Sequence, residues 1–186
     1  MSAQEPFVAP SGELNLATAA EMRTAGESLG GLLAAGDVVV LTGALGAGKT
    51  TLTQGIATGM GVRGRTQSPT FTIVREHKAG APGRPGLLHM DAYRLLGENV
   101  HDAAELPREV VLDTLESLDL DADLDDRVLV AEWGRGVVES LATEGSRVLD
   151  VEIDRGTGGG NGDVNEVTET TPEEEPRVLR WRWSRA

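Results

Sequence analysis

The sequence contains no cysteine and no long apolar run, and each absence excludes a class of protein. Without cysteine the chain forms no disulfide and holds no metal through a thiolate. No apolar run approaches the roughly 18 residues that cross a bilayer, and the N-terminus lacks a basic segment followed by an apolar one. We therefore expect a cytoplasmic protein that does not enter a membrane.

Basic residues are also scarce. The 186 residues include 17 Lys and Arg against 30 Asp and Glu, which gives a net charge of −13. Eleven of the acids lie between Glu98 and Asp126, and six more lie between Asp163 and Glu175. Because proteins hold RNA and DNA by neutralising phosphates with Lys and Arg, this chain is not expected to bind nucleic acid unaided. The acid runs are interpreted as solvated surface in preference to an acidic docking face.

One segment carries a specific chemical signal. Residues Gly43 to Thr50 read GALGAGKT, which matches the phosphate-binding loop G-x-x-x-x-G-K-[ST]. A β-branched apolar run precedes the loop at 37–42, and apolar residues at helical spacing follow it at 51–57. Strand, glycine loop and helix form the context in which this motif cradles a polyphosphate. The Lys49 ammonium would reach the β- and γ-phosphates, and the Thr50 hydroxyl would ligate Mg²⁺. The sequence predicts a nucleoside triphosphate site.

The remaining pattern predicts one compact α/β domain. A chain of this length, with 39% apolar residues, buries one core. Further strands are expected at 71–74, 87–90 and 127–131, and helices at 18–35 and 99–118. Alternating strands and helices favour a largely parallel sheet flanked by helices, with the ligand at the carboxyl ends of the strands.

The predicted boundaries divide the chain into four parts. Residues 1–12 are expected to form a flexible N-terminal tail, and residues 13–155 the P-loop domain. Residues 156–176, acidic and glycine-rich, are expected to be a disordered loop, and 177–186 a C-terminal strand. The alternating patterns at 148–153 and 178–183 predict that this last strand pairs with its predecessor as a hairpin.

Two acids end predicted buried strands and are candidates for the metal shell. Asp91 follows 87–90 and Glu132 follows 128–131. A P-loop hydrolase needs a carboxylate opposite its loop hydroxyl to hold Mg²⁺. Glu132 is the first choice because the strand before it is the more hydrophobic. The hydroxyls of Ser68 and Thr70 are interpreted as caps of a helix-to-strand turn.

Four ordered segments together resemble the TsaE (YjeE) family, a small bacterial ATPase of tRNA threonylcarbamoyladenosine biosynthesis. They are the P-loop with Thr51, the 68–74 segment SPTFTIV, the 89–95 segment HMDAYRL and the 130–133 segment VAEW. The resemblance covers roughly residues 14 to 155. The loop alone is shared by very many NTPases, whereas the ordered set is much more specific.

The resemblance implies that ATP is the ligand and that Mg²⁺ lies between Thr50 and Glu132. Catalytic roles are implied for Lys49, Asp91 and Glu132. The implied nucleotide-binding residues are Gly43, Leu45, Gly46, Ala47, Gly48, Lys49, Thr50, Thr51 and Trp133. The implied reaction is slow ATP hydrolysis coupled to the partner proteins TsaB and TsaD, which modify adenosine 37 of tRNA. The tRNA is then met only indirectly, in agreement with the negative charge.

Two rival functions share the same loop. A small-molecule kinase usually carries a mobile, arginine-bearing lid, whereas only Arg94 and Arg108 lie in the acidic stretch where a lid would be inserted. A nucleotide-dependent assembly factor would need ATP binding but not its hydrolysis, and the sequence does not separate this reading from a true ATPase cycle. Labelled phosphate passed to an acceptor identifies the kinase, and partner binding compared in ATP, ADP and a non-hydrolysable analogue identifies the assembly factor.

Overall fold

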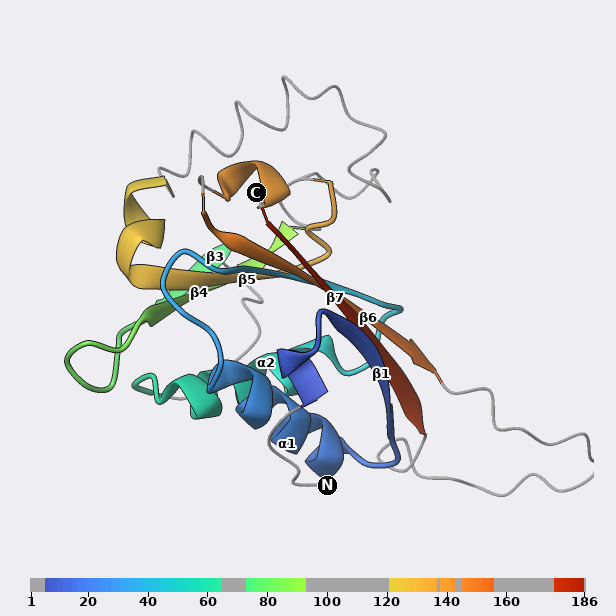
Figure 1. The fold of residues 1–186 in the computed structure, drawn as a ribbon. Coiled ribbons are helices and arrows are strands. Elements are labelled where there is room, and N and C mark those ends of the chain that lie inside the picture. The colour runs from blue at the N-terminus through green and yellow to red at the C-terminus, as the bar shows by residue number, and fades with distance from the viewer. Residues whose placement is uncertain are drawn as a thin grey trace, which may run out of the picture.

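The computed structural model describes residues 6–64, 73–92, 121–136, 138–142, 145–155 and 176–185. Their central feature is a seven-stranded sheet in the order β1-β7-β6-β2-β5-β4-β3 (Figure 1). The strands are β1 (Ser11–Leu16), β2 (Val38–Thr42), β3 (Val74–His77), β4 (Gly86–Asp91), β5 (Arg127–Glu132), β6 (Arg147–Arg155) and β7 (Arg177–Arg185).

The four middle strands are parallel and the outer ones antiparallel. Strand β2 pairs in parallel with both β5 and β6, and β5 pairs in parallel with β4. Strand β3 joins β4, β7 joins β6 and β1 joins β7, all antiparallel. The carboxyl ends of β6, β2, β5 and β4 therefore meet at one edge of the sheet. The predicted α/β fold with a parallel centre is confirmed.

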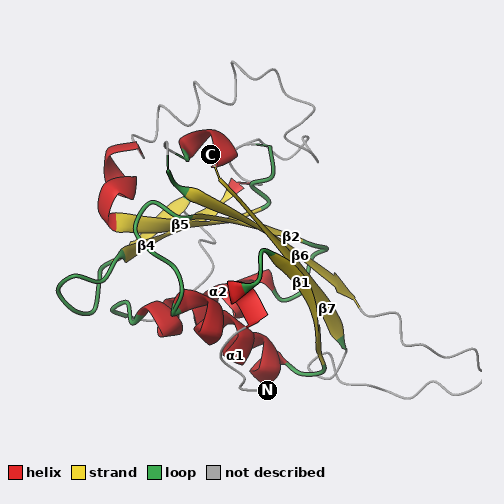
Figure 2. Ribbon diagram, in the orientation of Figure 1, coloured by secondary structure: helices red, strands yellow, loops and turns green. Residues whose placement is uncertain are grey.

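Two helices, α1 (Ala19–Gly30) and α2 (Lys49–Met60), cover one face of the sheet, as Figures 1 and 2 show. Their apolar residues share a core with alternate residues of the strands, among them Val39 and Val130. The two helices pack backbone to backbone: a Cβ on Gly26 would lie 2.4 Å from the Leu52 carbonyl oxygen. A side chain at this position would push apart the two helices, and with them the start of α2.

The opposite face is covered, within the described residues, by the short 3₁₀ helices η3 (Asp121–Asp126) and η4 (Val138–Leu141). Leu124 and Val138 pack there on the other set of strand residues, such as Val40 and Leu129. Every side chain of β2 from Val38 to Leu41 is buried, because helices lie on both of its faces. None of the helices in the described ranges is long and apolar enough to cross a membrane.

The N-terminal boundary corrects the sequence-based prediction. Of the predicted tail 1–12, residues Pro6–Val8 form a 3₁₀ helix, η1, and Ser11 and Gly12 belong to strand β1. Phe7 is only 1% exposed because its ring packs on Trp181 of β7. The contact joins residues far apart in sequence, so no local pattern signals it. The first helix also ends earlier than expected, at Gly30 and not at residue 35.

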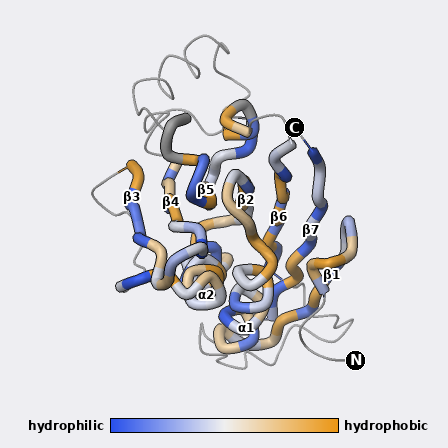
Figure 3. The backbone as a smooth tube through the Cα atoms, turned by 60° about the vertical axis from the view of Figure 1, so that its left-hand side comes forward, coloured by the Kyte–Doolittle hydropathy of each residue, from blue (hydrophilic) through white to orange (hydrophobic). Residues whose placement is uncertain are grey.

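The predicted C-terminal hairpin is confirmed. Strands β6 and β7 pair antiparallel from Arg147↔Arg185 to Arg155↔Arg177, and Figure 3 shows hydrophilic and hydrophobic residues alternating along them. The predicted loop between them, 156–176, lies outside the described residues except for Pro176, as do the whole of the predicted helix at 99–118 and the Ser68–Thr70 turn. Of the strand expected at 71–74, residues 71 and 72 lie outside the described residues, and only Val74 belongs to an observed strand, Val74–His77.

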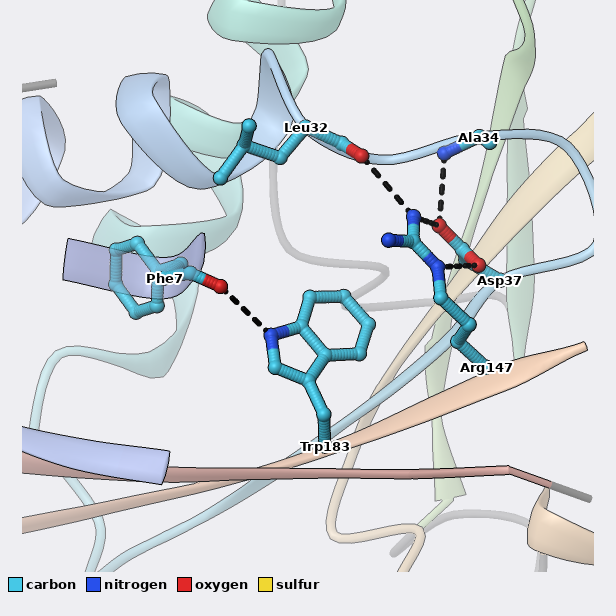
Figure 4. A network of polar contacts seen from close by, with 6 residues as sticks. All are labelled: Phe7, Leu32, Ala34, Asp37, Arg147 and Trp183. Atoms are coloured by element: carbon cyan, nitrogen blue, oxygen red, sulfur yellow. Dashed lines mark hydrogen bonds and ion pairs between the residues drawn. The ribbon is translucent and has the colours of Figure 1, made fainter. Parts of the chain in front are cut away.

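An ion pair closes the end of the sheet away from the P-loop. The Arg147 guanidinium donates to the Asp37 carboxylate, with Nε 2.9 Å from Oδ1, and also to the Leu32 carbonyl (Figure 4). The same carboxylate accepts the Ala34 N–H at 2.7 Å. The guanidinium also lies 4.6 Å from the ring centroid of Trp183. This network links the segment that enters β2 to strands β6 and β7.

Candidate functional site

The P-loop connects β2 to α2 at the edge where the parallel strands end. Gly43, Gly46 and Gly48 have φ values of 145°, 77° and 110°, which residues with a Cβ rarely adopt. Gly48 is the N-cap of α2 and provides no side-chain cap. The first N–H groups of the helix therefore face the loop, and together with the helix dipole they form an anion site.

Lys49, the first residue of α2, lies folded back into the loop. Its ammonium donates to the carbonyl oxygens of Gly43 and Ala44 at 2.7 and 3.1 Å. Burial lowers the pKa of this ammonium below its usual 10.5, although Glu132 and Asp91 act to raise it. The ammonium is thus held inside the site by uncharged carbonyl oxygens. A negatively charged phosphate oxygen would form a stronger hydrogen bond with it.

Trp133 covers the same ammonium. The centroid of its ring lies 3.9 Å from Lys49 Nζ, a cation–π contact. Its backbone has a φ of 63°, the only positive value at a non-glycine residue among the described residues. The Trp133 N–H donates to the Leu41 carbonyl at 2.9 Å, so the strained backbone is tied to β2 beside the loop.

Glu132 joins the loop to its neighbouring strand. The Thr50 hydroxyl lies 3.1 Å from its Oε1 and 3.3 Å from its Oε2. The Nε2 atom of His89, on β4, lies 2.9 Å from Oε1. Glu132 and His89 are both buried. Thr50 and Glu132 were predicted from the sequence as site residues, whereas His89 was noted only within the 89–95 segment that resembles the family.

Asp91 ends β4 as predicted, directly beside the end of β5. Its Cα partner across the parallel pair is Glu132, and its N–H donates to the Ile73 carbonyl at 2.9 Å. The two candidate carboxylates are therefore neighbours at the carboxyl edge of the sheet. Asp91 is also close enough to Lys49 to raise the pKa of its ammonium.

Two arginines contact the other side of the loop. Arg155 Nη2 lies 3.2 Å from the Leu45 carbonyl oxygen, and Arg177 Nη2 lies 3.5 Å from that of Gly46. They are opposed residues of the β6–β7 hairpin, at the carboxyl end of β6. Neither arginine was given a role from the sequence; the available signal was that Arg155 follows the strand predicted at 148–153 by two residues.

The structure thus brings together most of the predicted site residues. Lys49 contacts Trp133, Thr50 contacts Glu132, and Asp91 pairs with Glu132 across the two strands. Leu45, in contrast, is 85% exposed at the tip of the loop. The donor set suits a hard cation, because a hydroxyl and a carboxylate are oxygen ligands. No group of three or more His, Asp or Glu side chains that could hold a metal ion converges within the described ranges.

Comparison with known proteins agrees with this geometry. The family model described as "Threonylcarbamoyl adenosine biosynthesis protein TsaE" matches residues 16–160. The Mycobacterium tuberculosis protein named tRNA threonylcarbamoyladenosine biosynthesis protein TsaE is 44% identical over 163 residues, which are 88% of this chain and 82% of that protein. The Streptomyces coelicolor protein of the same name is 48% identical over 149 residues, 80% of this chain and 89% of its own length.

A solved structure shows the same fold. The crystal structure of Bacillus subtilis YdiB aligns with a TM-score of 0.59 over 95% of this chain and 86% of that one. At 24% identity this likeness concerns the arrangement of helices and strands. The sequence matches to the curated relatives are independent of it and extend across the P-loop, Asp91 and Glu132.

Proposed function

The chain belongs to the TsaE family, and from this premise we propose that it is a magnesium-dependent ATPase of tRNA threonylcarbamoyladenosine biosynthesis. The observation that carries the proposal is the contact between Thr50 and Glu132 beside the Lys49 ammonium. A loop hydroxyl, a buried carboxylate and a cation meet there at a helix N-terminus, where a triphosphate is expected.

Each group has a distinct part in the proposed chemistry. The N–H groups of the loop and of α2 bind the phosphates, and Lys49 neutralises the charge that builds up between the β- and γ-phosphates. Thr50 and Glu132 would hold Mg²⁺, which when bound neutralises phosphate charge. Asp91, beside Glu132, is proposed to act in turnover, and Trp133 to line the nucleotide site.

The protein is proposed to act through partner proteins in the cytoplasm. Its net charge of −13 makes it a poor ligand for the tRNA backbone, so contact with tRNA is proposed to be indirect, through TsaB and TsaD. Hydrolysis by the isolated chain is expected to be slow, and to be coupled to turnover of that complex.

The test combines two measurements on the full chain. Phosphate release from ATP is measured with and without Mg²⁺, and with and without TsaB and TsaD. The modified nucleoside is then quantified by mass spectrometry of digested tRNA from a strain depleted of the protein. Transfer of the phosphate to a small-molecule acceptor would identify a kinase instead, and unchanged levels of modified nucleoside would remove the proposed pathway.

A further inference from the structure

We propose that His89 is a positioning residue, which holds the Glu132 carboxylate in the orientation that receives the divalent cation. The inference rests on the proposed function, because it concerns the same metal-nucleotide site. His89 itself is not expected to touch the metal or the nucleotide.

The contact is short and protected from water. His89 Nε2 lies 2.9 Å from Glu132 Oε1, the His89 side chain is fully buried and that of Glu132 is 7% exposed. A carboxylate only accepts hydrogen bonds, so Nε2 is the donor. Since water does not compete for either partner, the hydrogen bond restricts rotation of the carboxylate.

The register of the sheet makes the contact possible. On β4 and β5, His89 pairs with Val130 and Asp91 pairs with Glu132, so the imidazole reaches a residue of the next strand that lies two pairs further along. The imidazole thus reaches the carboxylate from the neighbouring strand, whereas the Thr50 hydroxyl reaches it from the loop. His89 and Thr50 hold the same carboxylate from two elements.

The two contacts differ in what happens to them when a cation binds. The Thr50 hydroxyl donates to Glu132 in this structure, but it would turn a lone pair to Mg²⁺ once the metal is present. The His89 hydrogen bond does not compete with the metal. His89 engages Oε1 alone, so that Oε2 has, among the described residues, only the longer contact with the Thr50 hydroxyl, at 3.3 Å.

Packing alone does not account for an imidazole at this position. Its neighbours Leu87, Leu88 and Met90 are buried and apolar, and an apolar side chain at 89 would continue their pattern. Moreover, the second ring nitrogen, Nδ1, is buried with no hydrogen-bond partner among the described residues. A buried polar group carries a desolvation cost, which the single hydrogen bond to Glu132 offsets here. Partners of this kind typically change metal affinity 10- to 100-fold when removed.

The test compares His89→Gln with His89→Met. The two side chains have the same length and similar shape, but only the glutamine amide replaces the Nε2 donor. Calorimetry with a non-hydrolysable ATP analogue, in Mg²⁺ and in EDTA, gives the factor by which Mg²⁺ tightens nucleotide binding. We expect His89→Met to reduce this factor about 10-fold or more, His89→Gln to retain most of it, and affinity in EDTA to stay unchanged in both.

A double-mutant cycle ties the effect to Glu132. In a Glu132→Gln background, His89→Met should change the Mg²⁺ factor little further, because the carboxylate that it positions is gone. The inference would be overturned if Mg²⁺ tightened nucleotide binding by the same factor in His89→Met and His89→Gln. It would also be overturned if the effects of His89→Met and Glu132→Gln on this factor were additive in the double mutant. If His89→Met does not fold, His89→Asn takes its place, since its amide is too short to reach Oε1. An absence of Mg²⁺-dependent binding in the unmodified chain would instead refute the proposed function.

Discussion

The ring of Trp133 lies over the ammonium of Lys49, with 3.9 Å between Nζ and the ring centroid. The ammonium meanwhile donates to carbonyl oxygens of its own loop. To bind a phosphate, Lys49 has to leave these acceptors, so the surroundings of the indole must change as well. We therefore expect the contact between the two residues to change when a phosphate binds beside Lys49.

Nucleotide binding is therefore expected to change the fluorescence of Trp133. Two other tryptophans, Trp181 and Trp183, lie in β7, where their indole N–H groups donate to the Ala9 and Phe7 carbonyls. The ATP-dependent change should disappear in Trp133→Phe and persist in Trp183→Phe. A signal that survives in Trp133→Phe would show that the indole does not sense the site.

Lys49→Ala should abolish hydrolysis and weaken ATP binding, because the cation at the β- and γ-phosphates is removed. Loss of one group that stabilises transition-state charge typically costs about 10²-fold or more in rate. Burial opposes the charged form of this lysine, so its removal should leave the melting temperature unchanged or raise it. Near-normal phosphate release by a folded variant would contradict the P-loop assignment.

The two carboxylates at the sheet edge are expected to differ in role. Glu132→Ala should raise the Mg²⁺ concentration that supports half-maximal activity, because Glu132 contacts the Thr50 hydroxyl. Asp91→Ala should lower turnover and affect nucleotide affinity less. Titration of Mg²⁺ in both variants measures the difference. A larger shift in Mg²⁺ requirement for Asp91→Ala would mean that the roles are reversed.

Acid should destabilise the fold in part through His77. Burial lowers the pKa of His77 below 6.5, and His89 and Arg75 lower it further. The unfolded chain therefore binds a proton near pH 6.5 that the folded chain resists. The neutral His77 therefore contributes its full share of the free energy of unfolding above pH 6.5. This share decreases as the pH falls below 6.5, and the decrease stops once the pH is below the pKa of His77 in the folded chain.

Urea unfolding of the unmodified chain and of His77→Gln, from about pH 7.5 to about pH 5, tests this prediction. The free energy of unfolding of the unmodified chain should fall relative to that of the variant as the pH decreases. Carboxylates that titrate in both proteins cancel in this comparison. A constant difference across the range would contradict the predicted proton uptake.

The two partners of the ion pair between Arg147 and Asp37 should differ in how much unfolding free energy is lost when each is replaced by alanine. Asp37 is almost fully buried, whereas Arg147 is 40% exposed. Arg147→Ala leaves the buried carboxylate with one donor among the described residues, the Ala34 N–H, and should cost about 2–3 kcal/mol of unfolding free energy. Asp37→Ala should cost less, because the arginine reaches water. Chemical denaturation of both variants measures the two losses of unfolding free energy. A larger loss in Asp37→Ala than in Arg147→Ala would contradict the prediction.

The sequence by itself determined the P-loop, the type of most elements and the two acids that end buried strands. These features are local: a contiguous glycine loop provides its own backbone N–H groups, and a strand buried on both faces is a nearly continuous apolar run. The ends of neighbouring parallel strands necessarily meet at one edge, so Asp91 and Glu132 were expected near Lys49 and Thr50 before any contact was known.

Only the tertiary structure decided which partners these groups have. The contacts of Phe7 with Trp181, of Arg155 and Arg177 with the loop, and of His89 with Glu132 join segments that are distant in the chain. His89 interrupts an apolar strand, and a sequence pattern does not distinguish a histidine that fills a core from one that orients a carboxylate. That distinction depends on strand register, which is set by the summed packing of the whole sheet and not by any one segment.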